Sequence, residues 1–429
     1  MKIQIAKGVK DIDPEINIIK NKILNVITKK FEETGYNPLQ TPTIERFDVL
    51  SSKYAGGAEI LKETFKLTDQ GERDLCLRYD LTVPFARYIA MNPNLKLPFK
   101  RYQIGQVFRD GPIKLGRFRE FTQCDADVVG IKDVFAEAEL LNLAYEAFKE
   151  LNMNVKIIIN NRKILDSIIT EAKIPKEKIT STILTIDKIK KITIKEIEQE
   201  LRTKEITEEQ QTKLFETIKT RETNEETLKS LKKTLTDETA QQALTETEQL
   251  LNYLKQLNTP VIFDPSLARG LTYYTGTVFE IYLENSKIKS SISAGGRYDK
   301  MIGDFISNNQ EYPAVGISFG IDVIIEAIKQ DQEQTQQKCV TKAFIIPIGQ
   351  QEKSIQIMKE LRKNNINTEL NIAKKGISKA LDYASYYNIP YTILIGEDEI
   401  KNKKYTLRNM QTGNEEKLEM TQIIKKLKQ

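Results

Sequence analysis

Alternating polar and apolar residues predict a β-hairpin between residues 99 and 130. The run FKRYQIGQVF, residues 99–108, has a period of two, which is typical of a strand with one buried face. In the returning run, Arg119, Gln123 and Asp127 are four residues apart, so they point to the same face of a strand. The pattern therefore predicts two paired strands that carry charged and amide side chains on one face.

A basic, turn-rich loop joins these two runs. Residues 110–112, DGP, and Gly116 supply turn chemistry, while Lys114 and Arg117 place positive charge at the tip. Arginine presents a planar fork of donors that suits phosphate or carboxylate oxygens, and a carboxylate beside an amide binds N–H groups. The hairpin predicts either a site for a polyphosphate beside a small polar ligand, or a solvated face whose arginines pair with nearby carboxylates.

Periodicity and turn signals predict the other elements of the first 330 residues. A helix at 15–34 is followed by Pro38 and Pro42, which restrict residues 36–49 to an edge or interrupted strand. Further predicted elements are a hairpin at 58–80, helices from Thr82, at 132–150 and at 162–172, a strand at 155–159, helices at 175–258, a strand at 267–282, a glycine turn at 295–296, and a strand and helix at 312–329.

The last hundred residues predict a separate α/β domain. Residues 331–341 are polar and aperiodic, which is typical of a linker. Beyond them we expect strands at 343–348, 367–370, 391–395 and 404–409, helices at 354–364 and 377–387, and a basic terminal helix.

Composition narrows the classes of function. A chain of 429 residues predicts two or three domains, and a net charge of +5 permits a nucleic-acid partner without requiring one. The chain contains no histidine, which excludes a Ser-His-Asp triad, a histidine-liganded zinc and an imidazole general base. Its three cysteines are far apart, which favours a reducing cytoplasm, and no stretch predicts a signal peptide or a membrane span.

Several stretches resemble class II aminoacyl-tRNA synthetases, and among them the histidyl-tRNA synthetase family. VFRDGPIKLGRFREFTQCDADVVG, residues 107–130, resembles motif 2 of the class. RGLTYYTG (269–276) and GGRYD (295–299) resemble two signatures of histidyl-tRNA synthetases. Residues 15–49 and 312–329 resemble motifs 1 and 3, and the C-terminal segment resembles the anticodon-binding domain of class IIa synthetases. LRYDLTVPFAR and REFTQCD follow the archaeal and eukaryotic version of the family.

The resemblance implies an α+β fold with a class II antiparallel sheet flanked by helices. It implies a catalytic domain at 1–330 with a helical insertion at about 160–260, a linker at 331–341, and a C-terminal α/β anticodon-binding domain at 342–429. The implied activity is ATP-dependent activation of L-histidine and its transfer to tRNA(His). The resemblance further implies ATP as substrate, Mg²⁺, and a homodimer through motif 1. It also implies a cytoplasmic location and no membrane or DNA partner.

The resemblance also implies roles for single residues. Arg109 and Arg269 are the implied catalytic residues, facing the α-phosphate. The implied histidine pocket consists of Asp80, Leu81, Thr82, Gln123, Asp127, Arg269, Tyr273 and Tyr274. The implied ATP-binding residues are Arg109, Arg119 and Arg297, with no resident metal ligands. Judged from the residues alone, Asp80 and Thr82 are also suited to cap a helix, and Arg297 to form a salt bridge.

Two positions depart from the family's pattern. Val323 stands where the family commonly has an ATP-binding arginine, and Asp110 follows Arg109 where many class II enzymes have glutamate. The loss of a charge-assisted partner for ATP predicts either a compensating cation or reduced activity, and we expect compensation because the other motifs are intact. Two alternatives stay open: a non-catalytic paralogue of the type of the ATP phosphoribosyltransferase regulatory subunit, and a different class IIa synthetase.

Overall fold

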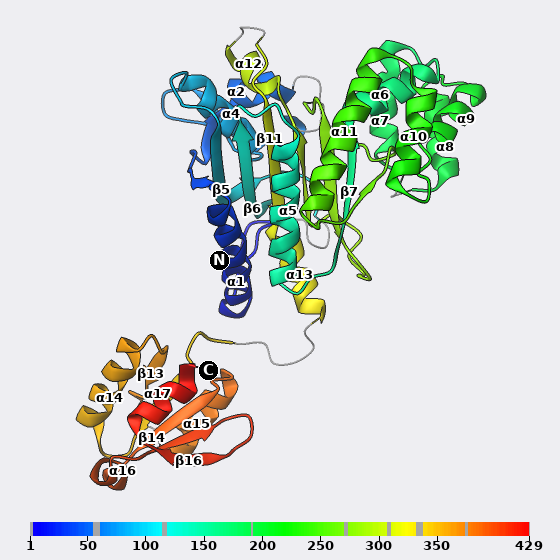
Figure 1. Ribbon diagram of the computed structural model, residues 1–429. Helices are drawn as coiled ribbons and strands as arrows, with labels where there is room; N and C mark the ends of the chain where they lie inside the picture. The colour runs from blue at the N-terminus through cyan, green and yellow to red at the C-terminus, as the bar shows by residue number, and fades with distance from the viewer. Residues whose placement is uncertain are drawn as a thin grey trace. The chain divides into compact units, whose positions relative to one another are not determined.

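The computed structural model of the chain describes residues 3–54, 61–113, 118–189, 192–269, 273–306, 310–331, 338–373 and 376–428. The chain divides into two units, residues 1–10 with 23–327 and residues 11–22 with 328–429 (Figure 1). Among the helices in the described ranges, none combines the length and the hydrophobicity that spanning a bilayer requires.

An eight-stranded sheet dominates the described part of the first unit. Its strand order is β1-β5-β6-β11-β10-β9-β7-β8. The strands are β1 (Asn37–Pro38), β5 (Phe99–Phe108), β6 (Glu120–Val129), β7 (Val155–Asn161), β8 (Val261–Phe263), β9 (Thr277–Leu283), β10 (Ser293–Arg297) and β11 (Ala314–Gly320). The pairs from β5 to β7 are antiparallel, and the short edge strands β1 and β8 pair in parallel with β5 and β7. The predicted hairpin is thus β5 and β6, at full length.

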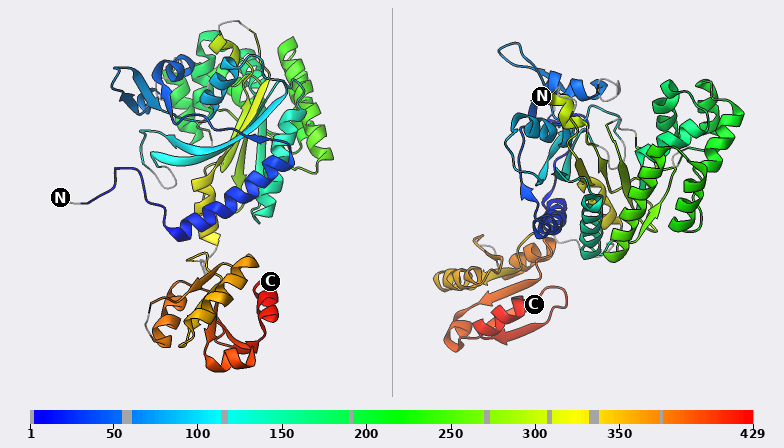
Figure 2. Two further views of the ribbon diagram at one scale, coloured as in Figure 1. Left: turned by 90° about the vertical axis from the view of Figure 1, so that its left-hand side faces the viewer. Right: turned by 45° about the horizontal axis from the view of Figure 1, so that its top comes forward.

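Helices α1 (Pro14–Glu33) and α5 (Phe135–Glu150) cover one face of this sheet. Phe31 of α1 stacks on Tyr102 of β5 with ring centroids 5.3 Å apart. Phe148 of α5 and Phe31 lie 5.6 Å and 5.9 Å from the ring of Phe319 in β11. Aromatic contacts of this kind anchor both helices to the sheet, and Figure 2 shows α1 and α5 on the same face of it.

Strand β5 differs from the prediction of one buried face. Arg101 and Gln103 are buried, and so is Tyr102 between them, which points to the opposite side. The reason is that both faces of β5 are covered: Phe31 of α1 stacks on Tyr102 on one face, and on the other Arg101 lies 4.4 Å from the ring centroid of Phe85.

A second, small sheet and three helices lie beside the hairpin. The sheet pairs β2 (Ile44–Arg46), β4 (Asp74–Leu77) and β3 (Lys66–Thr68), so the predicted hairpin at 58–80 is present over its described strands. Helices α2 (Phe47–Tyr54), α4 (Thr82–Met91) and α12 (Met301–Ile306) share one apolar core with it. The predicted interrupted strand is confirmed as β1 and β2, although its last residues begin α2.

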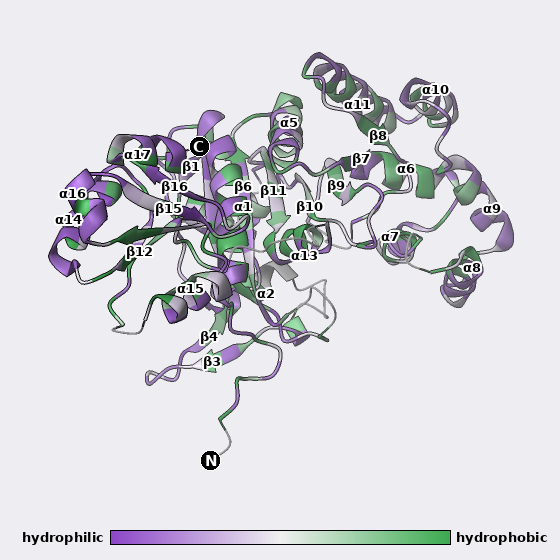
Figure 3. Ribbon diagram, turned by 90° about the horizontal axis from the view of Figure 1, so that it is seen from below, coloured by the Kyte–Doolittle hydropathy of each residue, from purple (hydrophilic) through white to green (hydrophobic). Residues whose placement is uncertain are grey.

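The segment between β7 and β8 is helical, as its periodicity predicts. Its elements are α6 (Arg162–Glu171), the 3-10 turn η1 (Lys176–Lys178), α7 (Ile179–Ile186), α8 (Ile194–Thr203), α9 (Glu208–Thr217), α10 (Asn224–Thr234) and α11 (Glu238–Gln256). Thr193, Thr207 and Thr223 start α8, α9 and α10 with capping boxes. Polar and apolar residues alternate along these helices (Figure 3), which is typical of helices that pack by one side.

Two signature stretches adopt conformations that differ from the predictions. The strand expected from Leu267 begins only at Thr277, so Arg269, Tyr273 and Tyr274 lie in the loop before β9. Conversely, Gly295 and Gly296 lie within β10 and not in a turn. A Cβ atom at Gly295 would lie 2.0 Å from the Gly316 carbonyl oxygen, so close packing of neighbouring strands explains the glycine.

Helix α13 (Ile321–Asp331) follows β11 directly, as predicted, and the second unit begins within it. That unit contains β12 (Ala343–Pro347), α14 (Gln351–Lys363), β13 (Thr368–Leu370), α15 (Ile377–Tyr386), β14 (Tyr391–Ile395), α16 (Glu397–Asn402), β15 (Tyr405–Asn409), β16 (Glu415–Leu418) and α17 (Met420–Lys428). Its sheet order is β13-β12-β14-β15-β16. The predicted α/β alternation is present; α16 and β16 were not predicted.

Candidate active site

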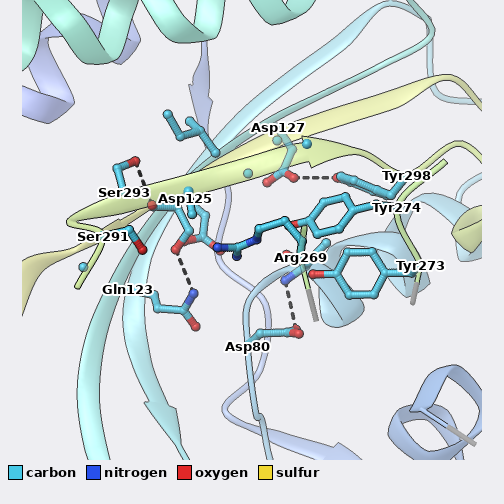
Figure 4. A pocket seen from close by; sticks show the side chains of 18 of the residues that line it. Asp80, Gln123, Asp125, Asp127, Arg269, Tyr273, Tyr274, Ser291, Ser293 and Tyr298 are labelled. Carbon is cyan, nitrogen blue, oxygen red and sulfur yellow. Dashed lines mark hydrogen bonds between the residues drawn. The ribbon is translucent and has the colours of Figure 1, made fainter. Parts of the chain in front are cut away.

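A cavity of about 330 Å³ lies on the face of the large sheet opposite α1 and α5 (Figure 4). Strands β6, β10 and β11 form its floor, and the loops before α4 and β9 contribute its walls. Eight predicted site residues line it, from segments far apart in the sequence: Asp80, Thr82, Arg109, Gln123, Asp127, Arg269, Tyr273 and Tyr274. The fold therefore brings most of the predicted site into one space.

The register of the sheet determines which residues surround Asp127, at the acidic end of the cavity floor. Asp127 of β6 stands opposite Arg101 of β5 and Gly316 of β11. Its carboxylate lies 2.7 Å from the Arg101 guanidinium and accepts a hydrogen bond from the Tyr298 hydroxyl at 2.5 Å. Burial raises the pKa of Asp127, while Arg101 and the bond from Tyr298 oppose that rise. A Cβ atom at Gly316 would lie 2.0 Å from Asp127 Oδ1, so glycine leaves the carboxylate its space.

Asp80 caps a helix and also lines the cavity, so its geometry is compatible with both of the roles that the sequence allows. Its Oδ1 accepts hydrogen bonds from the backbone N–H groups of Thr82 at 3.1 Å and Val83 at 2.9 Å, at the start of α4. The same side chain lines the cavity. Capping holds the carboxylate in place, and a fixed carboxylate at a cavity wall is suited to bind an ammonium group.

Arg269 and two tyrosines form the opposite wall. Arg269 is ion-paired with Glu280; burial lowers the pKa of its guanidinium, but Tyr274 and Glu280 outweigh burial and raise it. The rings of Tyr273 and Tyr274 lie 4.7 Å apart. A Cβ atom at Gly296 would lie 2.9 Å from the Tyr274 ring, so this glycine allows the ring to approach the sheet. Figure 4 shows the Arg269 side chain extending from the side of the two tyrosines toward Asp125.

Arg109 borders two neighbouring cavities. A second cavity, of about 310 Å³, shares Tyr79, Arg109, Phe121 and Gly320 with the first. The Arg109 guanidinium carbon lies 4.3 Å from the ring centroid of Tyr79 and 5.0 Å from that of Phe121, and Nε donates to the Tyr79 carbonyl oxygen at 3.2 Å. The other residues of the second cavity are Glu63, Gly111, Pro112, Phe118, Asp322 and Val323. A fixed cation thus stands at the junction of a polar cavity and a partly aromatic one.

Val323 lines the second cavity, and a cation from the N-terminal segment lies nearby. Lys10 Nζ is 3.2 Å from the carboxylate of Asp322 and 3.8 Å from the ring centroid of Phe118. Asp322 also accepts a hydrogen bond from the backbone N–H of Thr122 at 3.2 Å. Two residues that line this cavity therefore hold a lysine that is distant in sequence from the motif 3 segment.

Three predicted residues do not line either cavity. Arg297 is buried, and its Nε and Nη2 donate to Glu137 at 2.7 Å and 2.6 Å, so the geometry favours a salt bridge over a contact with ATP. Arg119 is ion-paired with Asp110 at 2.9 Å, and its Nε donates to the Gly111 carbonyl oxygen at 3.4 Å, so the loop of the hairpin holds its guanidinium.

Leu81 is also absent from the cavity lining, since its side chain is fully buried in the protein core. Its carbonyl oxygen accepts a hydrogen bond from Arg101 at 3.0 Å, so its role is to hold the floor. Lys114, Gly116, Arg117 and Gly270 lie outside the described residues.

Some lining residues were not predicted. Gln123 and Asp127 were singled out because they are four residues apart, and this spacing skips Phe121 and Asp125. The strand period of two residues places Phe121, Gln123, Asp125 and Asp127 on the same face. That alternation was a sufficient signal. Tyr298, Ser291 and Ser293 also line the cavity, but they depend on strand order in the sheet, which local sequence does not give.

The side chains around the cavity suit binding and charge stabilisation. Among the described residues, no group of three or more Asp, Glu or Cys side chains is placed to hold a metal ion. The first cavity instead combines carboxylates, phenols and an amide, which are suited to bind N–H groups, with two arginines, which are suited to bind oxygen anions. Such a site can align a small zwitterion against a phosphate ester.

Comparisons with known proteins give one family for almost the whole chain. A family model described as histidyl-tRNA synthetase matches residues 8–324, and one described as an anticodon binding domain matches residues 342–429. The chain is 46% identical over 426 residues to histidine–tRNA ligase 1 of Bacillus cereus, covering 99% of this chain and 97% of that protein.

Solved structures give the same result. The crystal structure of histidyl-tRNA synthetase from Nostoc sp. PCC 7120 matches with a TM-score of 0.89 at 30% identity, covering 100% of this chain and 99% of that one. An ATP phosphoribosyltransferase regulatory subunit/histidyl-tRNA synthetase from Bacillus halodurans matches with a TM-score of 0.75 at 21% identity, covering 89% and 96%, and shows the fold alone. The predicted fold class is confirmed. All three relatives are bacterial, although two motifs follow the archaeal and eukaryotic version.

Proposed function

Because the chain belongs to the histidyl-tRNA synthetase family, we propose that it joins L-histidine to tRNA(His) in two steps that consume ATP. It is an enzyme of the ligase type, since relatives named histidine–tRNA ligase match it over nearly its whole length. In the first step the histidine carboxylate attacks the α-phosphorus of ATP, and pyrophosphate leaves. In the second step the histidyl group passes from the adenylate to the terminal ribose of tRNA(His).

One observation carries this proposal: Arg109 borders two adjoining cavities of different character. The polar cavity suits histidine, and the cavity with Phe118 and Phe121 offers rings on which a nucleobase can stack. A guanidinium at their junction faces the α-phosphate, where negative charge spreads over oxygens as the carboxylate attacks. Arg269 supports it from the amino-acid side. Alignment and charge stabilisation account for the rate, and no protein nucleophile is needed.

Within the polar cavity each end of histidine has partners. Asp127, Tyr273 and Tyr274 bind the imidazole, and Asp80 with Thr82 binds the α-ammonium group. Gln123 donates to Ser318 at 2.8 Å, while its oxygen has no hydrogen-bond partner among the described residues and remains available to the ligand. A competitor without matching donors would leave these buried groups unsatisfied, which supports discrimination of about 10⁴-fold or more.

The nucleotide enters as MgATP, with the ion held mainly by the phosphates. Glu63 and Asp322, the two carboxylates that line the second cavity, would be the side chains to assist in holding the ion. Arg119 contributes from the rim of the hairpin. Arg297 is left out of the ATP site because Glu137 holds its guanidinium.

Histidine-dependent exchange of pyrophosphate into ATP tests the proposal. We expect exchange with L-histidine only among the standard amino acids, and charging of tRNA(His) by the same preparation. Exchange with proline, threonine or glycine would instead indicate another class IIa synthetase. Binding of histidine without exchange would indicate the regulatory type of paralogue, whose fold the Bacillus halodurans structure shares. Arg109, Arg269 and the anticodon-type segment speak against that second candidate.

Lys10 is the proposed replacement for the ATP-binding arginine that the family commonly has at the position of Val323. Replacing Lys10 with alanine is expected to raise the KM for ATP by about 10-fold, because one charge-assisted contact is lost, and to leave the KM for histidine unchanged. Lys10→Arg should keep most of the affinity. Lys7, an exposed neighbour in the same segment, provides the matched control as Lys7→Ala. Exchange kinetics at varied ATP measure the effect, and equal KM values in the Lys10→Ala and wild-type proteins would contradict the role.

The remaining proposals concern assembly and location. We assign residues 1–330 to catalysis, 331–341 to a linker and 342–429 to the anticodon, as the two family matches suggest. The exposed apolar side chain of Ile44, in the motif 1 segment, supports a homodimer through that region, which light scattering would detect as twice 49.3 kDa. Unpaired cysteines, two of them buried, favour the cytoplasm.

A further inference from the structure

The cavity floor contains a carboxyl group to which the roles above assign no function. Asp125 lies on β6 between Gln123 and Asp127 and is 2% exposed. Its neighbours across the strands are Gln103 on β5 and Ser318 on β11. The side chain lines the cavity and is visible there beside Arg269 (Figure 4).

One oxygen of this carboxyl group lacks a partner. Asp125 Oδ1 is buried and makes no hydrogen bond to any described residue, whereas the Ser318 hydroxyl hydrogen bonds to the carboxyl group. Burying a carboxylate without full compensation is costly, so native proteins seldom keep one that no ligand uses. The nearby arginine Arg78 does not explain it, because its guanidinium donates to the carbonyl oxygens of Gln106 and Thr41.

The position of Asp125 on the strand indicates which part of a ligand it meets. Residues two apart on a strand are about 7 Å apart, so Asp125 stands midway between the Asp127 end and the Gln123 end. In the proposed function, the imidazole lies at Asp127 and the carboxylate points toward Arg109. The α-ammonium group of histidine lies between these two groups, and Asp80 faces it from the wall.

We propose that Asp125 binds the α-ammonium group of the substrate together with Asp80, so that two carboxylates hold one cation. This inference rests on the proposed function and adds a specificity residue to the same cavity. It explains why the cavity carries three acidic residues on the amino-acid side, two on the floor and one on the wall, where the ligand brings a cation and an imidazole. Ligands without the ammonium group would gain nothing from Asp125.

Three ligands distinguish binding of the ammonium group by Asp125 from a general effect of the substitution on the cavity. L-histidine carries ammonium, carboxylate and imidazole; histamine lacks the carboxylate; 3-(imidazol-4-yl)propionate lacks the ammonium group. In Asp125→Asn, calorimetry should show about 10- to 100-fold weaker binding of histidine and of histamine, because each loses a charge-assisted contact. Binding of the propionate should be unchanged. Asp166→Asn, a carboxyl change in α6 outside the cavity, is the matched control and should leave all three affinities unaltered.

Proton release provides a second readout. Burial raises the pKa of Asp125 to about 7; Arg101 opposes this rise, while Asp127 and Asp80 add to it. A bound ammonium group lowers the pKa again, so histamine binding at pH 7 should release more protons from the wild type than from Asp125→Asn. Calorimetry in two buffers that differ in ionisation enthalpy measures that difference.

The possible outcomes all bear on the inference. Equal weakening of all three ligands, or of none, would overturn it. If Asp125→Asn does not fold, Asp125→Ser is compared with the same three ligands. If the wild type binds neither histidine nor histamine, the proposed function itself fails, and the inference with it. If the wild type binds both and Asp125→Asn binds them with unchanged affinity, only the inference fails.

Discussion

Replacing Arg109 with alanine is expected to lower the kcat of histidine-dependent exchange by about 10³-fold, the cost of removing a preorganised partner of the transition-state charge. Its guanidinium is held between two rings and by one bond to a carbonyl oxygen, and the residue is only half-buried. The unfolding temperature should therefore change little. Arg109→Lys should lose most of the activity as well, because an ammonium group lacks the planar fork.

Arg119→Ala is the matched control for this prediction. It is the other described arginine of the predicted hairpin outside β5, but it is ion-paired with Asp110 and lies outside both cavities. Its loss should lower kcat by much less, on the order of 10-fold or below. An equal loss in both variants would mean that the junction of the two cavities is not the reaction centre.

Replacing Asp127 with alanine is expected to cause the second large effect, and on two properties. The affinity for histidine should fall by about 10²-fold or more, because the pocket loses its imidazole acceptor, while the affinity for ATP stays nearly constant. The fold should lose about 3–5 kcal/mol, because Arg101, which is fully buried, is left without its counter-charge. Calorimetry with each ligand and urea unfolding measure the two effects.

A second buried ion pair provides a control that distinguishes a direct loss of histidine binding from a loss of stability. Glu137 and Arg297 are buried outside the cavity, so Glu137→Ala should lose similar stability and still bind histidine at a temperature where it is folded. The double variant Arg101→Met/Asp127→Ala should recover stability without recovering histidine binding. If Glu137→Ala weakens histidine as much as Asp127→Ala does, the loss reflects the fold, and Asp127 is no specific acceptor.

Much of the fold was predictable because its signals are local. The hairpin of β5 and β6, the helix α1 with the proline-limited strand after it, and the helical insertion follow from periods of two or 3.6 residues. The loop before β9 was not predictable in this way. Its aromatic and β-branched residues favour a strand, but Tyr273 and Tyr274 are held by contacts with β10 and Tyr298, which are distant in sequence.

The site was predictable to the extent that motifs name residues. Motif resemblance singled out Arg109, Gln123 and Asp127, which line one cavity. It could not distinguish an arginine that faces the cavity from Arg297, because the partner that holds Arg297 is a helix residue, Glu137, 160 positions away. The same limit hid Lys10: only the folded chain brings the N-terminal segment to Asp322.

The glycines of β10 and β11 restrict how this pocket can evolve. At Gly295, Gly296 and Gly316 an added Cβ atom would meet a carbonyl oxygen, an aromatic ring or the carboxylate of Asp127 at 2.0–2.9 Å. Every codon change that replaces glycine adds at least that atom, so no gradual path leads away from these positions. A change of specificity toward another amino-acid substrate must therefore begin on the walls of the cavity and not on its floor, because side chains there can change size by small steps.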